Sequence, residues 1–452
     1  MNLLLTYYGD DFTGSTDALE QLTLAGIRTV LFIAPPTSAQ LRRFPGLQAV
    51  GVAGLTRAMK PAAMEKELRP ALKQLKALGA RHVHYKVCST FDSSPSVGSI
   101  GRVMDVAAKI FPAPFIPVLA AAPALGRYTV FGTHFARYGI GSAGKIHRLD
   151  RHPAISNHPI TPMREADLRR HLARQTRKKI ALFDIWDVGL PESEGRAALQ
   201  AVLSEKPGAV LFDAVYEGQL KRIGGWIDAY ASARRPLFSI GSSGIETALA
   251  ANINARRSQA RSGRSRLAPA ATVPAVLVGS GSCSPVTAGQ IAWALKHGFG
   301  EVKLNASKLA AKGTALPEIT RAAAAAARML QSGRSVIVHT TRAGADQRVA
   351  AMLKQRTGPV LGAALGQVLR GVAEQCRVPR LCIAGGDTSS FAARELGLEA
   401  LDMIAPLTPG APLCRASAPG SPVDGLEVVF KGGQVGAENY FETVRSGKVK
   451  CG

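Results

Sequence analysis

Two adjacent acids close to the start of the chain are the first residues whose types and spacing could do chemistry. They lie in residues 7–17, YYGDDFTGSTD, between an apolar segment and a helical pattern. In open α/β sheets, ligands bind at the carboxyl ends of the strands. Asp10 and Asp11 would stand at such an end, and Ser15 or Thr16 can cap the helix that follows. The alternative is an acidic turn that caps a helix and binds nothing.

Cations and hydroxyls follow two further apparent strands. Arg57 ends the third strand, in GLTR, and Lys86 closes the next one before a loop that contains Ser89. The fork of donors on an arginine can clamp a carboxylate, while acids accept hydrogen bonds from sugar hydroxyls. Each of these residues alone is more often part of a surface ion pair. Together, at successive strand ends, they predict a site for a small hydroxy acid.

The second half of the chain carries loops that are suited to phosphate. Residues 279–287, GSGSCSPVT, follow an apparent strand and precede a helix, so small residues expose amides at a helix N-terminus. The third glycine of a dinucleotide fingerprint is missing. Residues 385–390, GGDTSS, repeat the theme, and Asp387 could hold magnesium or cap a helix. With the glycine pair at 432–433, these loops predict a nucleotide site, although a tight turn is the alternative for each.

One segment imitates two other kinds of site. Residues 139–146, GIGSAGKI, nearly spell a Walker A loop, but Ile146 stands where the magnesium-binding Ser or Thr belongs. Three histidines and an aspartate between residues 147 and 158 match no common zinc spacing. Because residues 139–162 also interrupt the rhythm of strands and helices, we interpret them as a long functional loop or flap.

Composition narrows the class of protein. The 452 residues are long for one domain, and the formal net charge is +24. Arginines are spread along the chain without a nucleic-acid-binding motif, which favours small anionic ligands or solvated surface over nucleic acid. Six scattered cysteines without paired spacing indicate reduced thiols in a cytoplasmic protein. A long apolar run and a secretion signal are both missing, so neither a membrane span nor export is expected.

Short apolar strands that alternate with helical patterns predict an α/β fold with two domains and mainly parallel sheets. The expected strands are residues 3–8, 29–33, 49–53, 82–86, 118–121, 129–131, 180–183, 209–212 and 237–240, then 275–279, 302–304, 335–339, 381–384 and 426–431. Residues 251–273 are polar, basic and weakly patterned. We therefore predict domains at 1–250 and 274–452, joined by this linker, with the active site in the interdomain cleft.

Five motifs occur in the order in which four-carbon acid sugar kinases carry them. They are DDFTG at 10–14, KVCSTFDSS at 86–94, GSSG at 241–244, GSCSPVT at 281–287 and GGDTS at 385–389. The chain resembles that family over nearly its whole length. The resemblance implies an N-terminal domain that binds an acid sugar and a C-terminal domain that binds ATP.

The resemblance also implies roles for individual residues. The sugar acid would be contacted by Asp10 or Asp11, Arg57, Lys86, Val87, Cys88 and Ser89. ATP would be contacted by Ser282 or Ser284, Gly385, Gly386, Asp387, Thr388 and Gly433, with Asp387 on the metal side. The stretch that begins at Cys88 resembles the one in 3-oxo-tetronate kinases. Threonate and erythronate kinases tend to carry an aspartate at the position of Cys88. Two features depart from the family: Asp387 where GGET is common, and the histidine-rich insert at 139–162.

These observations predict an ATP-dependent kinase that phosphorylates the terminal hydroxyl of a four-carbon sugar acid, either 3-oxo-tetronate or threonate or erythronate. Magnesium would bridge the phosphates, and Asp10 or Asp11 would act as the base. We expect no nucleic-acid or membrane partner and leave a homo-oligomer open. The alternatives are a protein that binds nucleic acid or an anionic surface, and a sugar-phosphate aldolase or isomerase.

Overall fold

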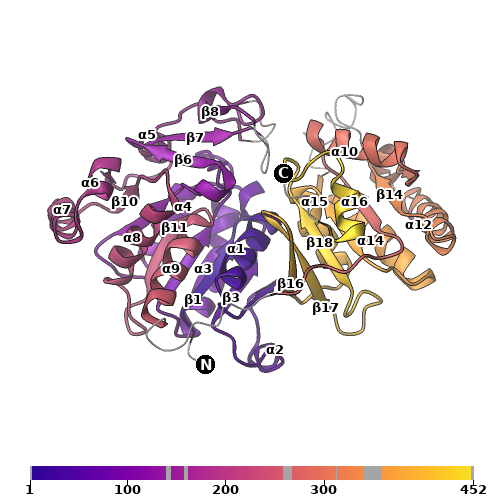
Figure 1. Cartoon of the computed structure of the whole chain (residues 1–452), viewed down its shortest axis with the longest axis horizontal. Coiled ribbons are helices and arrows are strands. Elements are labelled where there is room, and N and C mark those ends of the chain that lie inside the picture. The colour runs from indigo at the N-terminus through magenta and orange to yellow at the C-terminus, as the bar shows by residue number, and fades with distance from the viewer. Residues whose placement is uncertain are drawn as a thin grey trace. The chain divides into compact units, whose positions relative to one another are not determined.

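The computed structural model of the chain describes residues 3–138, 144–156, 161–257, 267–311, 313–340 and 358–448. They form two compact units (Figure 1). The first lies within residues 1–265, and the second contains residues 31–34 and the described residues from 267 onward. Both units contain mainly parallel strands that alternate with helices, so the predicted α/β class is confirmed.

The first unit is built on a parallel sheet with the strand order β3-β1-β4-β11-β5-β10-β9. Four of the expected strands match residue for residue, because short apolar runs between turn residues mark them clearly. The strands are β1 (Leu5–Gly9), β3 (Ala49–Ala53), β4 (His82–Lys86), β5 (Ile116–Leu119), β9 (Ile180–Phe183), β10 (Ala209–Phe212) and β11 (Leu237–Gly241). Strand β2 (Thr29–Phe32) begins in this unit, and its last two residues belong to the second.

Helices connect these strands and cover the sheet. In α3, buried Met64, Leu68, Leu72 and Leu75 recur at helical spacing and form one apolar face. The helices are α1 (Phe12–Leu24), α2 (Ser38–Arg42), α3 (Pro61–Ala77), α4 (Ile100–Ala108), α5 (Leu168–Ala173), α6 (Ile185–Gly189), α7 (Glu192–Ser204), α8 (Glu217–Asp228) and α9 (Gly244–Arg257), with short 3₁₀ turns η1 (Thr56–Ala58), η2 (Pro123–Leu125) and η3 (Leu149–Arg151). Helix α9 continues into the segment that was expected to be linker.

A small antiparallel sheet differs from the expectation. Residues 129–131 were predicted to join the parallel sheet, but β6 (Arg127–Val130) pairs with β7 (Thr133–Arg137), and β7 pairs with β8 (Ile146–Arg148). The burial of β6 and β7 alternates from residue to residue, as in a hairpin with one covered face. Part of the proposed flap at 139–162 therefore forms this sheet. Residues 139–143 and 157–160, which include most of GIGSAGKI and His158, lie outside the described residues.

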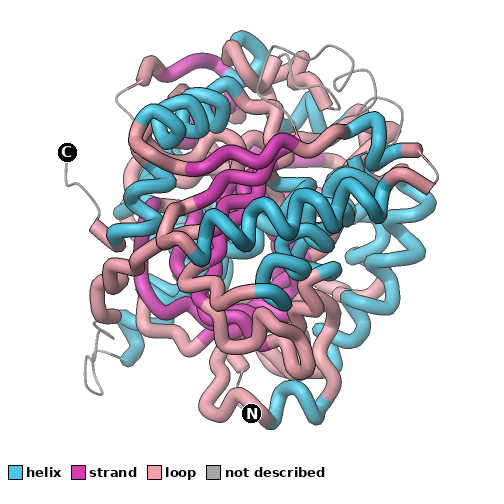
Figure 2. The backbone as a smooth tube through the Cα atoms, turned by 90° about the vertical axis from the view of Figure 1, so that its right-hand side faces the viewer, coloured by secondary structure: helices cyan, strands magenta, loops and turns pink. Residues whose placement is uncertain are grey.

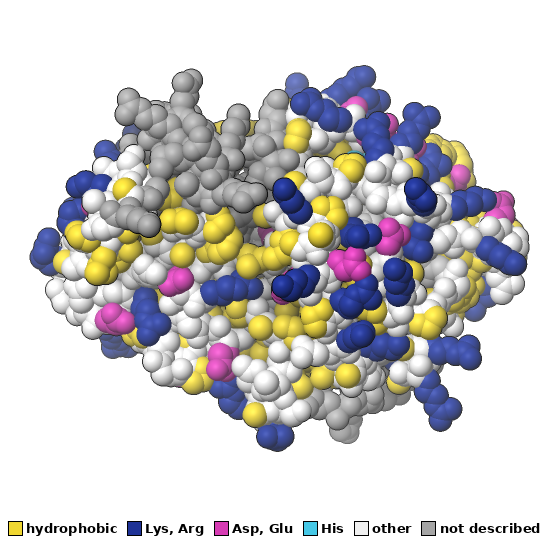
Figure 3. All heavy atoms as spheres, turned by 180° about the vertical axis from the view of Figure 1, so that it is seen from behind, with side chains coloured by type: hydrophobic (Ala, Val, Ile, Leu, Met, Phe, Trp, Pro, Cys, Tyr) yellow, Lys and Arg dark blue, Asp and Glu magenta, His cyan; other side chains and the backbone are white. Residues whose placement is uncertain are grey.

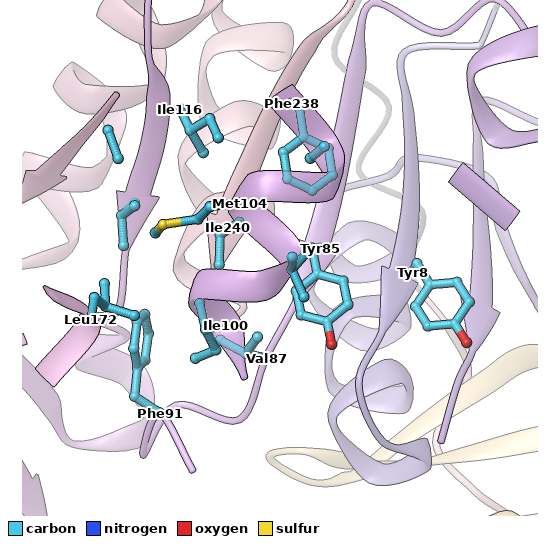
Figure 4. Close-up of a cluster of buried hydrophobic side chains, with 14 of the residues drawn as sticks. Tyr8, Tyr85, Val87, Phe91, Ile100, Met104, Ile116, Leu172, Phe238 and Ile240 are labelled. Carbon is cyan, nitrogen blue, oxygen red and sulfur yellow. The ribbon is translucent and has the colours of Figure 1, made fainter. Parts of the chain in front are cut away.

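The core of the first unit holds the sheet and the loop after β4 in place (Figure 4). Tyr8 of β1 and Tyr85 of β4 stack with their ring centroids 6.2 Å apart. Val87 and Phe91, from the loop, are fully buried in the same cluster. Burying two apolar side chains of one loop stabilises it by roughly 3–6 kcal/mol, so the polar residues between them are presented on a fixed backbone.

The second unit has a sheet of mixed direction. Its strands follow the order β13-β14-β12-β15-β18-β17-β16, and those from β13 to β18 are parallel. Figure 2 shows helices lying across the strands. The elements are β12 (Leu277–Ser280), α10 (Pro285–Lys296), β13 (Gly300–Lys303), α11 (Ala306–Ala310), α12 (Ala315–Gln331), β14 (Val336–His339), α14 (Gly358–Gln375), β15 (Leu381–Ala384), α15 (Gly386–Glu395), β16 (Ala400–Thr408), β17 (Ala411–Ser417), β18 (Glu427–Lys431) and α16 (Tyr440–Ser446).

The hairpin of β16 and β17 was not among the expected strands. The segment contains prolines at 406, 409 and 412, and proline cannot donate to a sheet ladder. Here the turn contains Pro409 and Gly410, whose φ of 82° suits glycine. The register also shifts twice along the pair, between Met403 and Ala405 and again before Thr408. Such irregularities admit prolines that a regular ladder would reject.

The positive charge is distributed over the surface. Figure 3 shows many Lys and Arg side chains on one face, with fewer Asp and Glu among them. Much of the +24 charge therefore belongs to solvated side chains, which was one of the two explanations that the sequence allowed, beside small anionic ligands. Of the helices within the described residues, none is both long enough and apolar enough to cross a bilayer.

Candidate active site

The carboxyl ends of β3, β1, β4 and β11 bring the predicted sugar-acid residues together. Gly9 at the end of β1 is level with Lys86 on β4, which is in turn level with Gly241 on β11. Backbone hydrogen bonds join the loops beyond these ends: the amide of Asp10 donates to the oxygen of Lys86 at 2.8 Å, and the amide of Arg57 donates to the oxygen of Asp10 at 3.1 Å. Residues far apart in the sequence thus share one edge of the sheet.

Asp11 is held by three partners. It is the N-cap of α1, where its carboxylate accepts from the amide of Gly14 at 2.8 Å and from the hydroxyl of Thr13 at 2.9 Å. Arg57 Nη1 lies 2.8 Å from its Oδ2. Burial alone would raise the pKa of Asp11, but Arg57 and Lys86 hold it below its ordinary value. Asp11, and not the expected Ser15 or Thr16, therefore caps the helix and stays ionised.

Asp10 is in a different electrostatic state from its neighbour. It is only 3% exposed, and its Oδ1 has no hydrogen-bond partner among the described residues. Burial, together with the charge of Asp11, raises the pKa of Asp10 to about 8, despite the opposing charges of Arg57 and Lys86. A carboxyl group that titrates near neutral pH is suited to accept a proton from a substrate.

Lys86 faces carboxylates of the protein itself. Its Nζ lies 3.3 Å from Asp17 Oδ2 and donates to the backbone oxygen of Val87 at 3.1 Å. Burial lowers the pKa of Lys86, but Asp17 and Glu246 outweigh burial and raise it, so the ammonium stays charged. Burial raises the pKa of Glu246, on α9, to about 8. Neither Asp17 nor Glu246 was predicted as a site residue, although both lie next to motifs.

The loop after Lys86 is fixed at both of its sides. The backbone of Phe91 has a φ of 53°. Residues with a side chain rarely adopt this conformation, and it persists only where surrounding contacts impose it. His134 Nε2 donates to the backbone oxygen of Ser89 at 2.8 Å, and Ser93 Oγ lies 2.7 Å from His171 Nε2. Cys88 Sγ lies 2.9 Å from the Thr90 hydroxyl. Burial raises the pKa of Cys88 to about 12, so this side chain is a thiol and not a nucleophile.

A second set of strand ends collects the predicted nucleotide residues within the second unit. Ser280, Ala384 and Lys431 are level with one another at the ends of β12, β15 and β18. The amide of Gly385 donates to the backbone oxygen of Lys431 at 2.9 Å, which joins the loop after β15 to the end of β18. The hydroxyl of Thr287 donates to the backbone oxygen of Gly433 at 3.0 Å, which joins the segment after β12 to the loop after β18.

The glycines of these loops leave no room for a side chain. A Cβ on Gly433 would lie 2.9 Å from Ser284 Cβ and 3.0 Å from Ser282 Oγ. A Cβ on Gly281 would lie 2.3 Å from Thr388 Oγ1. Gly385 has a φ of 119°. The backbones of three loops therefore approach one another closely, which is the arrangement that exposes amides to a phosphate chain.

Lys431 closes the last strand before the glycine pair at 432–433, but it was not predicted as a site residue. It is fully buried, and its Nζ donates to the hydroxyl of Thr287 at 2.9 Å. Nζ also lies 5.5 Å from the centre of the Tyr440 ring. Burial lowers the pKa of Lys431 to about 7. The position at a strand end, before two glycines, was the only signal in the sequence.

The metal assignment to Asp387 falls on a side chain that the structure does not describe. Its backbone lies in the first turn of α15. Within the described residues, no group of three or more His, Cys, Asp and Glu side chains is arranged to hold a metal ion. Magnesium in kinases is usually held by one or two carboxylates together with substrate phosphates, so it needs no such group.

Both halves of the chain match known domains. A family model described as "Sugar-binding N-terminal domain" matches residues 5–249, and one described as "Nucleotide-binding C-terminal domain" matches residues 277–441. These matches define a protein that joins a sugar-binding domain to a nucleotide-binding domain. The chain belongs to the four-carbon acid sugar kinase family, as its motifs predict.

Relatives are similar over nearly the full length. A 3-oxo-isoapionate kinase of Paraburkholderia graminis is 42% identical, over 99% of this chain and 95% of the relative. A 3-oxo-tetronate kinase of Methylobacterium radiotolerans is 32% identical, over 98% of each chain. The solved structure of a Salmonella typhimurium protein has a TM-score of 0.75 at 25% identity, covering 97% of this chain and 98% of that one.

Proposed function

We propose that this protein is an ATP-dependent kinase that phosphorylates a hydroxyl of a 3-oxo sugar acid. The observation that carries the proposal is the division of labour between two sets of strand ends: acids and cations in the first unit, glycine loops in the second. The two relatives described above both act on 3-oxo acids. The predicted 3-oxo-tetronate therefore stays a candidate, 3-oxo-isoapionate joins it, and threonate and erythronate become less favoured.

Asp10 is the better of the two candidates for the base. Phosphoryl transfer needs a group that orients the acceptor hydroxyl and takes its proton. Asp11 is committed to Arg57 and to the cap of α1, whereas Asp10 keeps an oxygen without a partner. A general base is most effective when its pKa lies near the pH at which the enzyme works, and burial raises the pKa of Asp10 to about 8. In this proposal Asp11 positions Arg57, which contributes positive charge to the acid site.

The remaining sugar-acid residues form the wall of the site. Lys86 supplies a buried positive charge, and the backbone of Val87 through Ser89 supplies polar groups beside the acceptor. Cys88 acts through its size and its neutral thiol, since it is not ionised near neutral pH.

The second unit fits a nucleotide. Ser282, Ser284, Gly385, Gly386, Thr388 and Gly433 would hold the phosphates, because the crowded glycines allow backbone amides to reach them. Magnesium would neutralise charge on the phosphates, with Asp387 as its protein ligand. Residues 1–250 would thus form the sugar-acid domain and residues 274–452 the nucleotide domain. A homo-oligomer and a cytoplasmic location stay predictions.

A coupled assay of ADP release tests the proposal. The purified full chain would be given ATP and magnesium with each of four acids: 3-oxo-tetronate, 3-oxo-isoapionate, threonate and erythronate. We expect turnover with a 3-oxo acid and at least tenfold lower kcat/KM with the two acids that lack the oxo group. ADP release without any acid measures the background. Turnover of none of the four acids above this background would refute the proposal.

A further inference from the structure

One buried arginine of the first unit forms no ion pair with any carboxylate that the structure describes. Arg127 opens β6 and is only 4% exposed. Its Nη1 donates to the backbone oxygens of Leu125, Gly126 and Arg137, at 3.0, 3.3 and 3.0 Å. Its Nε is buried and has no hydrogen-bond partner. The guanidinium is thus anchored through one nitrogen and keeps an unused donor.

The other two cations of the candidate site already have counter-ions. Arg57 pairs with Asp11 at 2.8 Å, and Lys86 pairs with Asp17 at 3.3 Å. A buried charge without a partner is costly, so it is retained where a bound ligand supplies the opposite charge. Arg127 is the cation of this region that meets that description.

Arg127 lies within electrostatic reach of the sugar-acid site. Burial lowers its pKa, and the nearby Cys88, Asp92 and Asp17 oppose that effect. Two of these three residues belong to the loop that follows Lys86, and the third pairs with Lys86. The charge of the guanidinium is therefore felt by the loop that follows Lys86.

The small sheet is tied firmly to that loop. His134, on the strand that pairs with β6, donates from Nε2 to the oxygen of Ser89 at 2.8 Å. Its Nδ1 accepts from the hydroxyl of Thr129 at 2.9 Å. Burial lowers the pKa of His134 to about 4, so the ring is neutral and keeps this tautomer. The sheet that carries Arg127 is thus hydrogen-bonded to the loop at Ser89.

We propose that Arg127 binds the carboxylate of the sugar-acid substrate through the part of its guanidinium that the backbone oxygens of Leu125, Gly126 and Arg137 leave unused. This inference rests on the proposed function and names the residue that selects the acid group. A planar guanidinium recognises a carboxylate with two parallel hydrogen bonds, which a lysine cannot reproduce. Arg127 thereby makes the protein prefer an acid to an uncharged molecule of the same shape.

The test compares an acid with its own carboxamide as acceptors. Arg127→Gln and Arg127→Lys would be measured beside the wild type, with the best 3-oxo acid and its amide. Arg148→Gln is the matched control, because Arg148 lies on β8 of the same small sheet but is exposed and paired with Asp150 at 2.6 Å. We expect Arg127→Gln to lower kcat/KM for the acid about 100-fold, as for loss of one partner of a buried charge pair.

The expected pattern separates binding from a structural role. With Arg127→Gln, the value for the amide and the KM for ATP should stay near wild type, and Arg127→Lys should recover part of the acid preference. Arg148→Gln should behave as wild type. An equal loss for acid and amide, or an unchanged acid preference, would overturn the assignment.

Two further outcomes are decided in advance. If Arg127→Gln does not fold, Arg127→Lys decides: an acid preference at least tenfold below wild type supports the assignment, and a wild-type preference overturns it. If the wild-type protein transfers phosphate to no sugar acid, the proposed function fails and the assignment fails with it. An active wild type with an indifferent Arg127 removes only the assignment.

Discussion

Replacing Asp10 with asparagine should make the protein more stable and inactive. Burial raises the pKa of Asp10 from 3.8 to about 8, so the folded state holds a proton that the unfolded state releases between those values. Folding stability is therefore lost as the pH rises from about 4 to 8. Asparagine never ionises, so this loss disappears in the variant.

The size of the effect follows from the pKa values. A pH of 7 is about three units above the pKa of the Asp10 carboxyl in the unfolded chain, so that carboxyl is ionised there. In the folded protein the same carboxyl is still mostly protonated at pH 7. At 1.36 kcal/mol per unit, Asp10→Asn should raise the free energy of unfolding by about 4 kcal/mol at pH 7 and by about 1–2 kcal/mol at pH 5. The loss of a general base should lower kcat by about 100-fold or more.

Fluorescence-detected urea unfolding can isolate the first unit. Replacing Trp293 by phenylalanine leaves Trp186 and Trp226, which both lie in that unit. Asp11→Asn in the same background is the matched control, since it removes one partner of the buried ion pair with Arg57 while asparagine can still cap the helix. It should destabilise the unit by about 3 kcal/mol.

A pH profile completes this test. In the wild type, kcat/KM should rise about tenfold per pH unit and level off near pH 8, where Asp10 has lost its proton. The reasoning fails if Asp10→Asn keeps wild-type activity, or if its gain in stability does not grow between pH 5 and pH 7.

Three further predictions concern other parts of the molecule. Arg57→Ala should raise the KM for the acid at least tenfold and leave ATP affinity nearly unchanged in steady-state kinetics; an equal loss of ATP affinity would contradict its place in the acid site. Gly433→Val should abolish the thermal stabilisation by ATP while the fold survives, because a Cβ there would meet Ser284 at 2.9 Å; normal stabilisation would remove this glycine from the nucleotide site. Residues 1–250 alone should bind the sugar acid in calorimetry but release no ADP, since the glycine loops lie beyond residue 278, and turnover by this fragment would refute the division of labour.

Several features could be predicted from the sequence because they depend on short stretches of chain. Strand β3 is a short apolar run, and β4 combines valine and tyrosine with histidines and a lysine; both follow turn residues, so they could be placed, and with them Asp10, Arg57 and Lys86. The glycine loops of the second unit could be placed in the same way, because each follows a short apolar strand. The hairpin of β16 and β17 could not be found this way, since its prolines are tolerated only through irregular pairing.

Only the tertiary structure distinguishes residues of the same type. Asp10 and Asp11 are adjacent and chemically identical, yet Arg57 and the cap of α1 keep one ionised while burial protonates the other. Lys86 owes its charge in part to Glu246, which only the pairing of β4 with β11 brings near. Charge state depends on burial and on partners distant in sequence, so it is decided when the chain folds.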